Sequence, residues 1–201
     1  MTDALIRMTM IAGLTIVSLA VLYGFSRLRV SLKKREIERG HKLYDEGDYS
    51  GALQCAEKLK ETVFQPLAYD LIGDCYNRLG NEEKAIEAYK KAIQIDSSIT
   101  TSHLSLGEIA LLKRKYEDAI SHFTAILAVD PEMVIARLYL AAAYKLSGNM
   151  AMFQNEFSVI RKGKVIPANI LQLRNLNNYS LRGMLEEIIA EGCSEGSSGR
   201  G

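Results

Sequence analysis

The chain has 201 residues, and 48% of them are hydrophobic, which is enough to bury the core of an ordinary domain and excludes a largely disordered chain. Its 25 Lys and Arg residues nearly balance its 24 Asp and Glu residues, so no overall field gathers nucleic acid or another strongly charged partner. The three cysteines, Cys55, Cys75 and Cys193, are far apart and lack the spacing of a zinc site or a redox pair. We interpret them as buried or idle thiols in a reducing compartment.

The first predicted element is a transmembrane helix over residues 8–26, preceded by a short non-cytoplasmic tail, residues 1–7. Residues 8–25 contain no charged side chain. At about 1.5 Å per helical residue, such a run nearly matches a hydrocarbon core about 30 Å thick.

Two other interpretations of this run are weaker. A cleaved signal peptide is one alternative, because Arg7 precedes the run and residues 18–20 resemble a small-x-small cleavage site. However, the apolar run continues to Phe25. A mitochondrial presequence fits less well, because Asp3 and an uninterrupted apolar run are not typical of an Arg-rich amphipathic helix.

A basic juxtamembrane linker, residues 27–35, is predicted next. Its basic residues are Arg27, Arg29, Lys33, Lys34 and Arg35, whereas only Arg7 precedes the span. The positive-inside rule places the following domain in the cytoplasm, and we expect a single-pass protein of a bacterial inner membrane. The same five residues could contact anionic headgroups at the membrane surface.

A pattern of small, aromatic and aliphatic residues then recurs at a fixed spacing. In register, Gly73 matches Gly107, Ala85 matches Ala119, Tyr89 matches Phe123, and Asp96 matches Asp130. Each unit contains two amphipathic helical patterns separated by a turn signal. The small residues allow two helices of one hairpin to approach closely, and the aromatic residues fill the space towards the next hairpin.

These residues resemble the tetratricopeptide repeat family, whose unit is a helix-turn-helix of about 34 residues. The resemblance implies a solenoid over residues 36–163, with repeats at approximately 33–65, 66–99, 100–133 and 134–163. Residues 164–191 are expected to form C-terminal capping helices, and residues 192–201 a disordered tail. The predicted fold class is therefore all-α, with an N-terminal transmembrane helix, an α-solenoid of about four repeats, and capping helices.

Catalysis is not predicted. The histidines, His41, His103 and His122, are scattered and have no carboxylate or cysteine at metal-ligand spacing. The sequence has no glycine loop for phosphate and no nucleophile elbow. We expect no enzyme activity, cofactor, metal, nucleic acid or small-molecule substrate.

The resemblance implies instead that the first helix of each repeat lines a concave groove that binds a peptide. The polar groove candidates are Glu38, His41, Asp45, Asp70, Asp74, Asn77, Arg78 and Glu108, and the apolar ones are Leu111, Leu112, Leu138 and Tyr139. The half of the groove nearer the predicted membrane is acidic, and the other half is apolar and aromatic. This predicts an amphipathic partner helix with a basic end. Alternatively, the C-terminal helices of the chain itself could fill this groove in place of a partner.

One ligand class of the family is not expected. Members that bind the acidic C-terminal tails of chaperones carry a clamp of lysine, asparagine and arginine on their first helices. The corresponding positions here hold Ile37, His41, Thr101 and Ser105. The sequence therefore predicts no chaperone-tail adaptor.

The leading functional hypothesis is a membrane-anchored cytoplasmic scaffold that gathers partner proteins or peptide helices for assembly or quality control. One alternative is a receptor for basic amphipathic targeting helices, resembling the anchored import receptors of the mitochondrial outer membrane. Another is a structural subunit of a larger membrane complex.

Overall fold

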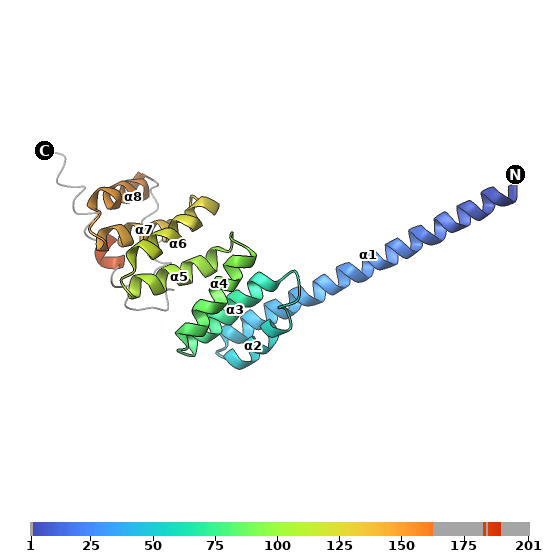
Figure 1. Cartoon of the computed structure of the whole chain (residues 1–201), viewed down its shortest axis with the longest axis horizontal. Coiled ribbons are helices and arrows are strands. Elements are labelled where there is room, and N and C mark those ends of the chain that lie inside the picture. The colour runs from blue at the N-terminus through green and yellow to red at the C-terminus, as the bar shows by residue number, and fades with distance from the viewer. Residues whose placement is uncertain (1, 163–182, 184, 190–201) are drawn as a thin grey trace. The chain divides into compact units, whose positions relative to one another are not determined.

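The computed structural model of the protein describes residues 2–162, 183 and 185–189, and all regular structure in these ranges is α-helical. The helices follow one another as α1 (Thr2–Asp45), α2 (Tyr49–Glu57), α3 (Gln65–Arg78), α4 (Glu82–Ile95), α5 (Thr100–Leu112), α6 (Tyr116–Val129), α7 (Val134–Leu146) and α8 (Met150–Lys162) (Figure 1). The chain forms two compact units, Met1–Ala88 and Tyr89–Gly201, and the boundary falls within α4.

Within each helical hairpin (α1–α2, α3–α4, α5–α6 and α7–α8), a tight turn joins the two helices and has one residue in the left-handed region. Gly47, Gly80 and Gly148 take φ values of 85°, 73° and 82°, which glycine adopts without steric cost. In the α5–α6 turn the same place is held by Arg114, with φ of 58°. A side chain there costs about 1–2 kcal/mol, so this turn depends on the packing of the helices it joins.

The first unit has its core where α1, α2 and α3 meet. Ile37 of α1 is buried together with Ala52 of α2 and Leu71 of α3. A Cβ added at Gly40 would lie 2.7 Å from Leu71 Cδ2 and 3.2 Å from Cys55 Cβ. The absence of a side chain at Gly40 therefore allows the C-terminal part of α1 to pack closely on both neighbours.

The second unit has a larger core built from α5 to α8. Its largest buried side chains are Phe123, Tyr139, Phe153 and Phe157. A short helical piece, residues 185–189, adds the buried side chains Leu185, Ile188 and Ile189 to the same cluster. The rest of the predicted capping region 164–191, and the predicted tail 192–201, lie outside the described residues.

Helix α1 is 44 residues long and continues far beyond the first hairpin (Figure 1). The predicted linker 27–35 is instead part of this continuous helix, because no glycine or proline interrupts residues 25–39. Large apolar side chains before the hairpin are exposed, among them Leu19 at 66%, Leu22 at 64% and Phe25 at 61%.

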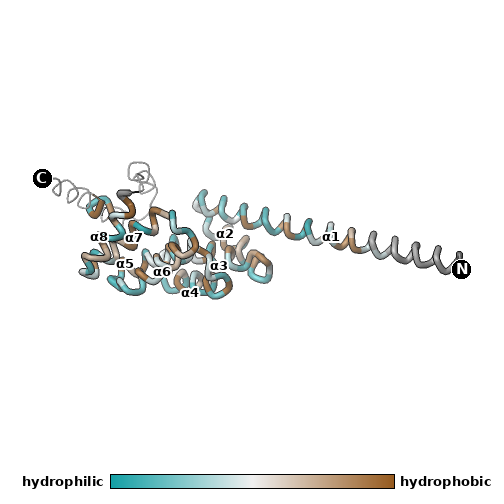
Figure 2. The backbone as a smooth tube through the Cα atoms, turned by 90° about the horizontal axis from the view of Figure 1, so that it is seen from above, coloured by the Kyte–Doolittle hydropathy of each residue, from teal (hydrophilic) through white to brown (hydrophobic). Residues whose placement is uncertain are grey.

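Among the described residues, no helix is both long enough and apolar enough to cross a membrane. The transmembrane helix predicted at residues 8–26 gains no support from this finding. Along the helices of the two units, apolar and hydrophilic residues alternate, as expected for elements that bury one face (Figure 2).

Candidate functional site

The position of α5 in the second unit is set by its contact with α6. A Cβ added at Gly107 of α5 would lie only 2.5 Å from the ring of Phe123 on α6. Phe123 is fully buried and stacks on Tyr139 of α7, with ring centroids 5.1 Å apart and planes within 9° of parallel. These contacts fix the side chain of Tyr139 against α5.

Glu108, the residue after Gly107, meets the hydroxyl of this fixed tyrosine. Tyr139 Oη donates a hydrogen bond of 2.6 Å to Glu108 Oε1. Burial raises the pKa of Glu108, and the hydrogen bond opposes the rise only in part. Burial and then the charge of Glu108 raise the pKa of Tyr139, so the tyrosine keeps its proton and acts as the donor.

The accessible side of α5 is a narrow row of residues, which we call the α5 stripe. It comprises Thr101, Leu104, Ser105, Glu108 and Leu112, and these recur at helical spacing. Leu112 is 48% exposed, although it is a large apolar side chain. The opposite side of α5 is buried, so the stripe is the face that this helix presents to other molecules.

The twelve predicted groove residues fall into three classes of exposure. Glu38, His41, Asp45, Asn77, Arg78 and Leu112 are exposed, Asp74 and Glu108 are half-buried, and Asp70, Leu111, Leu138 and Tyr139 are buried. The expectation that the last four line an open surface is therefore corrected. Leu111, Leu138 and Tyr139 belong to the core cluster of the second unit. In the second unit, the structure brings Glu108 and Tyr139 together as a hydrogen-bonded pair.

Arg78, another predicted groove residue, is engaged within the first unit. Its Nε donates a 2.9 Å hydrogen bond to Tyr44 Oη, and its guanidinium lies 5.7 Å from the centroid of that ring. The hydrogen bond to Tyr44 is the main cause of the raised pKa of Arg78. Arg78 therefore ties α3 to α1.

The five basic residues predicted at a membrane surface, Arg27, Arg29, Lys33, Lys34 and Arg35, all lie on α1. Lys33 Nζ donates to the backbone oxygen of Lys58 at 3.3 Å, which anchors it to the first hairpin. Lys34 lies 3.8 Å from the carboxylate of Glu38 in an exposed pair. Such exposed pairs contribute little to stability, so Lys34 remains available to an anionic partner.

Sequence reasoning missed a pair of histidines within the second unit. His103 Nδ1 lies 3.0 Å from His122 Nδ1, and His103 Nε2 lies 3.3 Å from the backbone oxygen of Ser97. Because that oxygen can only accept, His103 carries its proton on Nε2 and accepts at Nδ1 from His122. Burial lowers the pKa of both histidines, so the pair is uncharged at neutral pH.

The repeat register contained the signal for this pair. His122 precedes Phe123, which packs on Gly107, and His103 lies one helical turn before that glycine. Within the described ranges, no group of three or more His, Cys, Asp or Glu side chains is placed to hold a metal ion.

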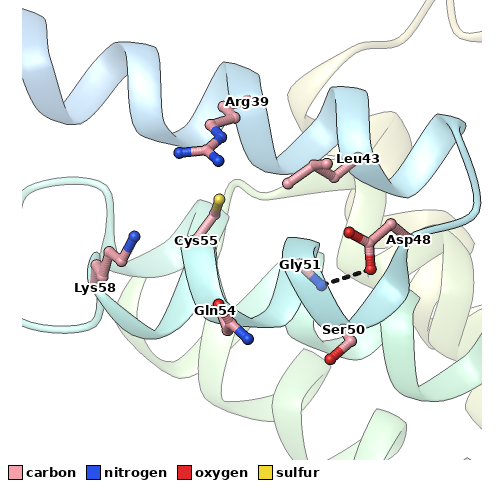
Figure 3. Close-up of a pocket in the computed structure, with 8 residues that line it drawn as sticks. All are labelled: Arg39, Leu43, Asp48, Ser50, Gly51, Gln54, Cys55 and Lys58. Carbon is pink, nitrogen blue, oxygen red and sulfur yellow. Dashed lines mark hydrogen bonds between the residues drawn. The ribbon is translucent and has the colours of Figure 1, made fainter.

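A surface pocket of about 370 Å³ lies between α1 and α2 in the first unit (Figure 3). Its lining residues are Arg39, Leu43, Asp48, Ser50, Gly51, Gln54, Cys55 and Lys58. Asp48 is occupied as a helix cap, because its Oδ1 accepts a 2.9 Å hydrogen bond from the Gly51 amide. Burial raises the pKa of the Cys55 thiol. A nucleophilic cysteine needs a lowered pKa, so this thiol is not activated.

Comparison with known proteins agrees with these hairpins. Tetratricopeptide repeat profiles match residues 67–99 and 104–151. A TPR repeat-containing protein of Methanocaldococcus jannaschii is 34% identical over 56 residues, which cover 28% of this chain and 18% of that protein. Tetratricopeptide repeat protein 1 of Schizosaccharomyces pombe is 26% identical over 130 residues, with 53% of this chain and 12% of that protein covered. The chain therefore spans less than a fifth of the length of these two relatives.

Two solved structures share the fold at low sequence identity. A tetratricopeptide repeat protein from Parabacteroides merdae has a TM-score of 0.59 at 17% identity, covering 81% of this chain and 66% of that one. The first TPR domain of Spaghetti, bound to an HSP90 peptide, has a TM-score of 0.51 at 22% identity, covering 59% and 95%. The hairpins, the two matched ranges and these structures together identify residues 67–99 and 104–151 as tetratricopeptide repeats in an all-helical solenoid fold.

Proposed function

We propose that the protein is an interaction scaffold that binds a helical segment of a partner protein along α5, the first helix of its third repeat. The observation that carries this function is the α5 stripe. It places one half-buried carboxylate, Glu108, between two apolar side chains, Leu104 and Leu112. A helix with apolar and polar anchors at three- and four-residue spacing matches such a row.

Leu112 supports contact with a partner more directly than the rest of the stripe. It is 48% exposed, whereas the neighbouring Leu111 is 4% exposed. Covering an exposed leucine removes apolar surface from water and contributes about 25 cal/mol per Å². Exposed apolar surface next to polar groups often marks a contact site.

The partner is expected to differ from the HSP90 peptide held by the Spaghetti domain. Binding of an acidic tail needs cationic side chains on the first helices. Ile37 is buried in the core of the first unit, and Ser105 on α5 carries no charge. On α5, Glu108 would repel an acidic ligand and favour a basic one.

We also propose that residues 8–26 of α1 tether the scaffold to a bacterial inner membrane, with the repeats on the cytoplasmic side. Support comes from the uncharged run in this part of the sequence and from the exposed Leu19, Leu22 and Phe25. Large apolar side chains exposed to water are more stable in an apolar environment. The basic residues from Arg27 to Arg35 would then face anionic headgroups.

Site-specific photo-cross-linking tests the scaffold function. Benzoylphenylalanine replaces Leu112 in one variant and Val129 in a control variant, because Val129 is similarly exposed, at 51%, but lies on α6. We expect a discrete protein adduct in cells from position 112 and none from 129. Equal adducts from both positions, or none from position 112, would contradict the function.

Membrane fractionation tests the tether separately. The chain is expected to stay with membranes after an alkaline wash. A Leu19→Arg, Leu22→Arg variant is expected to be released, because each central arginine costs about 2.5–3.5 kcal/mol on insertion. Recovery of the unaltered chain in the washed supernatant would refute the tether and leave the scaffold function untouched.

A further inference from the structure

The carboxylate of Glu108 is poorly compensated for its degree of burial. Among the described residues, its one hydrogen bond comes from Tyr139 to Oε1, and no cation lies within ion-pair distance. Buried charges are normally paired, because leaving water costs several kcal/mol unless a counter-charge or several hydrogen bonds replace it. Here Oε2 has no such partner in the described part of the chain.

The surroundings hold this carboxylate in one place. Tyr139 is fully buried and stacks on Phe123, and Phe123 is confined by Gly107. The hydroxyl therefore positions Glu108 before any ligand arrives. A preorganised acceptor loses little freedom on binding, which favours affinity for a matching donor.

The neighbours of Glu108 on the stripe define the rest of the ligand. Leu104 and Leu112 lie four residues before and four residues after it, about 6 Å along the helix axis in each direction. A partner helix that packs along α5 would place one residue opposite Glu108 and apolar residues one turn to either side.

We propose that Glu108, held by Tyr139, is the recognition point for a lysine or arginine side chain on the partner helix, with apolar residues about four positions before and after that basic residue. This inference rests on the scaffold function proposed above. The incoming cation would donate to the open Oε2 and complete the carboxylate's hydrogen bonding. Charge-assisted hydrogen bonds of this kind are shorter and about twice as strong as neutral ones.

The test is a selection from a displayed library of 16-residue amphipathic helices on the full-length protein. Four forms of the protein are compared: wild type, Glu108→Gln, the control Glu61→Gln and the groove variant Leu112→Asp. Glutamine retains an oxygen that accepts from Tyr139, so Glu108→Gln removes the charge without removing the hydrogen bond. Glu61 is exposed in the first unit and serves as the matched loss of one carboxylate.

On wild type and on Glu61→Gln, we expect enrichment of Lys or Arg at one register position with leucine-like residues four positions away. On Glu108→Gln, the apolar positions should persist and the basic preference should disappear. A synthetic helix from the selection should bind wild type about 10-fold more tightly than Glu108→Gln, and its Lys→norleucine analogue should bind both equally.

Other outcomes separate the two levels of inference. Equal enrichment of basic residues on wild type and Glu108→Gln would overturn the role of Glu108 and leave the scaffold function standing. If no selected helix binds wild type more tightly than Leu112→Asp, both the role of Glu108 and the scaffold function are overturned.

Discussion

Replacing Glu108 with glutamine is expected to stabilise the protein at neutral pH. The change removes a charge that burial disfavours while keeping an acceptor for Tyr139 Oη, 2.6 Å away. If Glu108 were retained for stability, its replacement would destabilise the protein. A residue retained for binding can gain stability, because function often conserves a locally unfavourable group.

The magnitude follows from the environment of the carboxylate. Mutational data put the burial of an incompletely compensated polar group at about 1–3 kcal/mol. Glu108 keeps one hydrogen bond and is only half-buried, so we expect the lower end, about 1 kcal/mol in favour of Glu108→Gln. Tyr139→Phe should destabilise the protein by about 1–2 kcal/mol, because it removes the donor and leaves the half-buried carboxylate without its hydrogen bond.

The effect should depend on pH with a definite sign. The folded pKa of Glu108 is raised above 4.5, so the folded state holds this proton to higher pH than the unfolded state. Wild-type stability therefore falls as pH rises from 4.5 through the folded pKa. The advantage of Glu108→Gln should therefore be larger at neutral pH than well below pH 4.5, where both states of the wild type are protonated.

Urea unfolding followed by circular dichroism measures these differences at both pH values. Glu61→Gln, on an exposed loop, controls for the loss of one negative charge. The free energy of unfolding should rise for Glu108→Gln and stay within about 0.5 kcal/mol for the control. A loss of stability in Glu108→Gln at neutral pH would refute the view that this carboxylate is poorly compensated.

Three further predictions concern the second unit, each measured by urea unfolding. Gly107→Ala should lower the free energy of unfolding by about 1 kcal/mol, because overlap of the new methyl group with Phe123 outweighs the gain in helix propensity. The same change should cost less in a Phe123→Leu background; an equal cost in both backgrounds would contradict the contact. Because the pKa values of His103 and His122 lie below 6.5 in the folded state, stability should decline as pH falls below 6.5, and substitution of both by glutamine should flatten this slope; an unchanged slope would exclude the pair as its source. Glu156→Gln should cost about 3 kcal/mol, because buried Glu156 pairs with half-buried Arg137 at 2.7 Å and the change leaves that arginine without its counter-charge. A cost below about 1 kcal/mol would show that water replaces the pair.

The hairpins could be predicted because the repeat pattern encodes local contacts. Gly107 and Phe123 recur in register with Gly73 and Tyr89, and the structure shows the close packing that this pairing implies for the third hairpin. Small and aromatic positions at a fixed period leave few alternative ways to pack two amphipathic helices. The register therefore predicts helix pairing without knowledge of distant contacts.

The exposure of individual groove residues could not be predicted in the same way. Leu111 and Leu112 are adjacent, yet they are 4% and 48% exposed, because one step along a helix turns the side chain by about 100°. Tyr139 was expected at an open surface, but it points into the core and stacks on Phe123. Leu138 is likewise buried in a cluster to which residues 185–189 contribute. Periodicity identifies a face approximately, whereas burial depends on which later segments cover it.

The most direct test of the account is the affinity of the partner captured from position 112, measured by isothermal titration against wild type, Leu112→Asp and Val129→Asp. The side chains of Leu112 and Val129 are 48% and 51% exposed, so the two variants place the same charge at similarly accessible sites on α5 and α6. Binding through the α5 stripe predicts at least about 10-fold weaker affinity for Leu112→Asp and unchanged affinity for Val129→Asp. Equal affinities for all three proteins, or a loss confined to Val129→Asp, would contradict it.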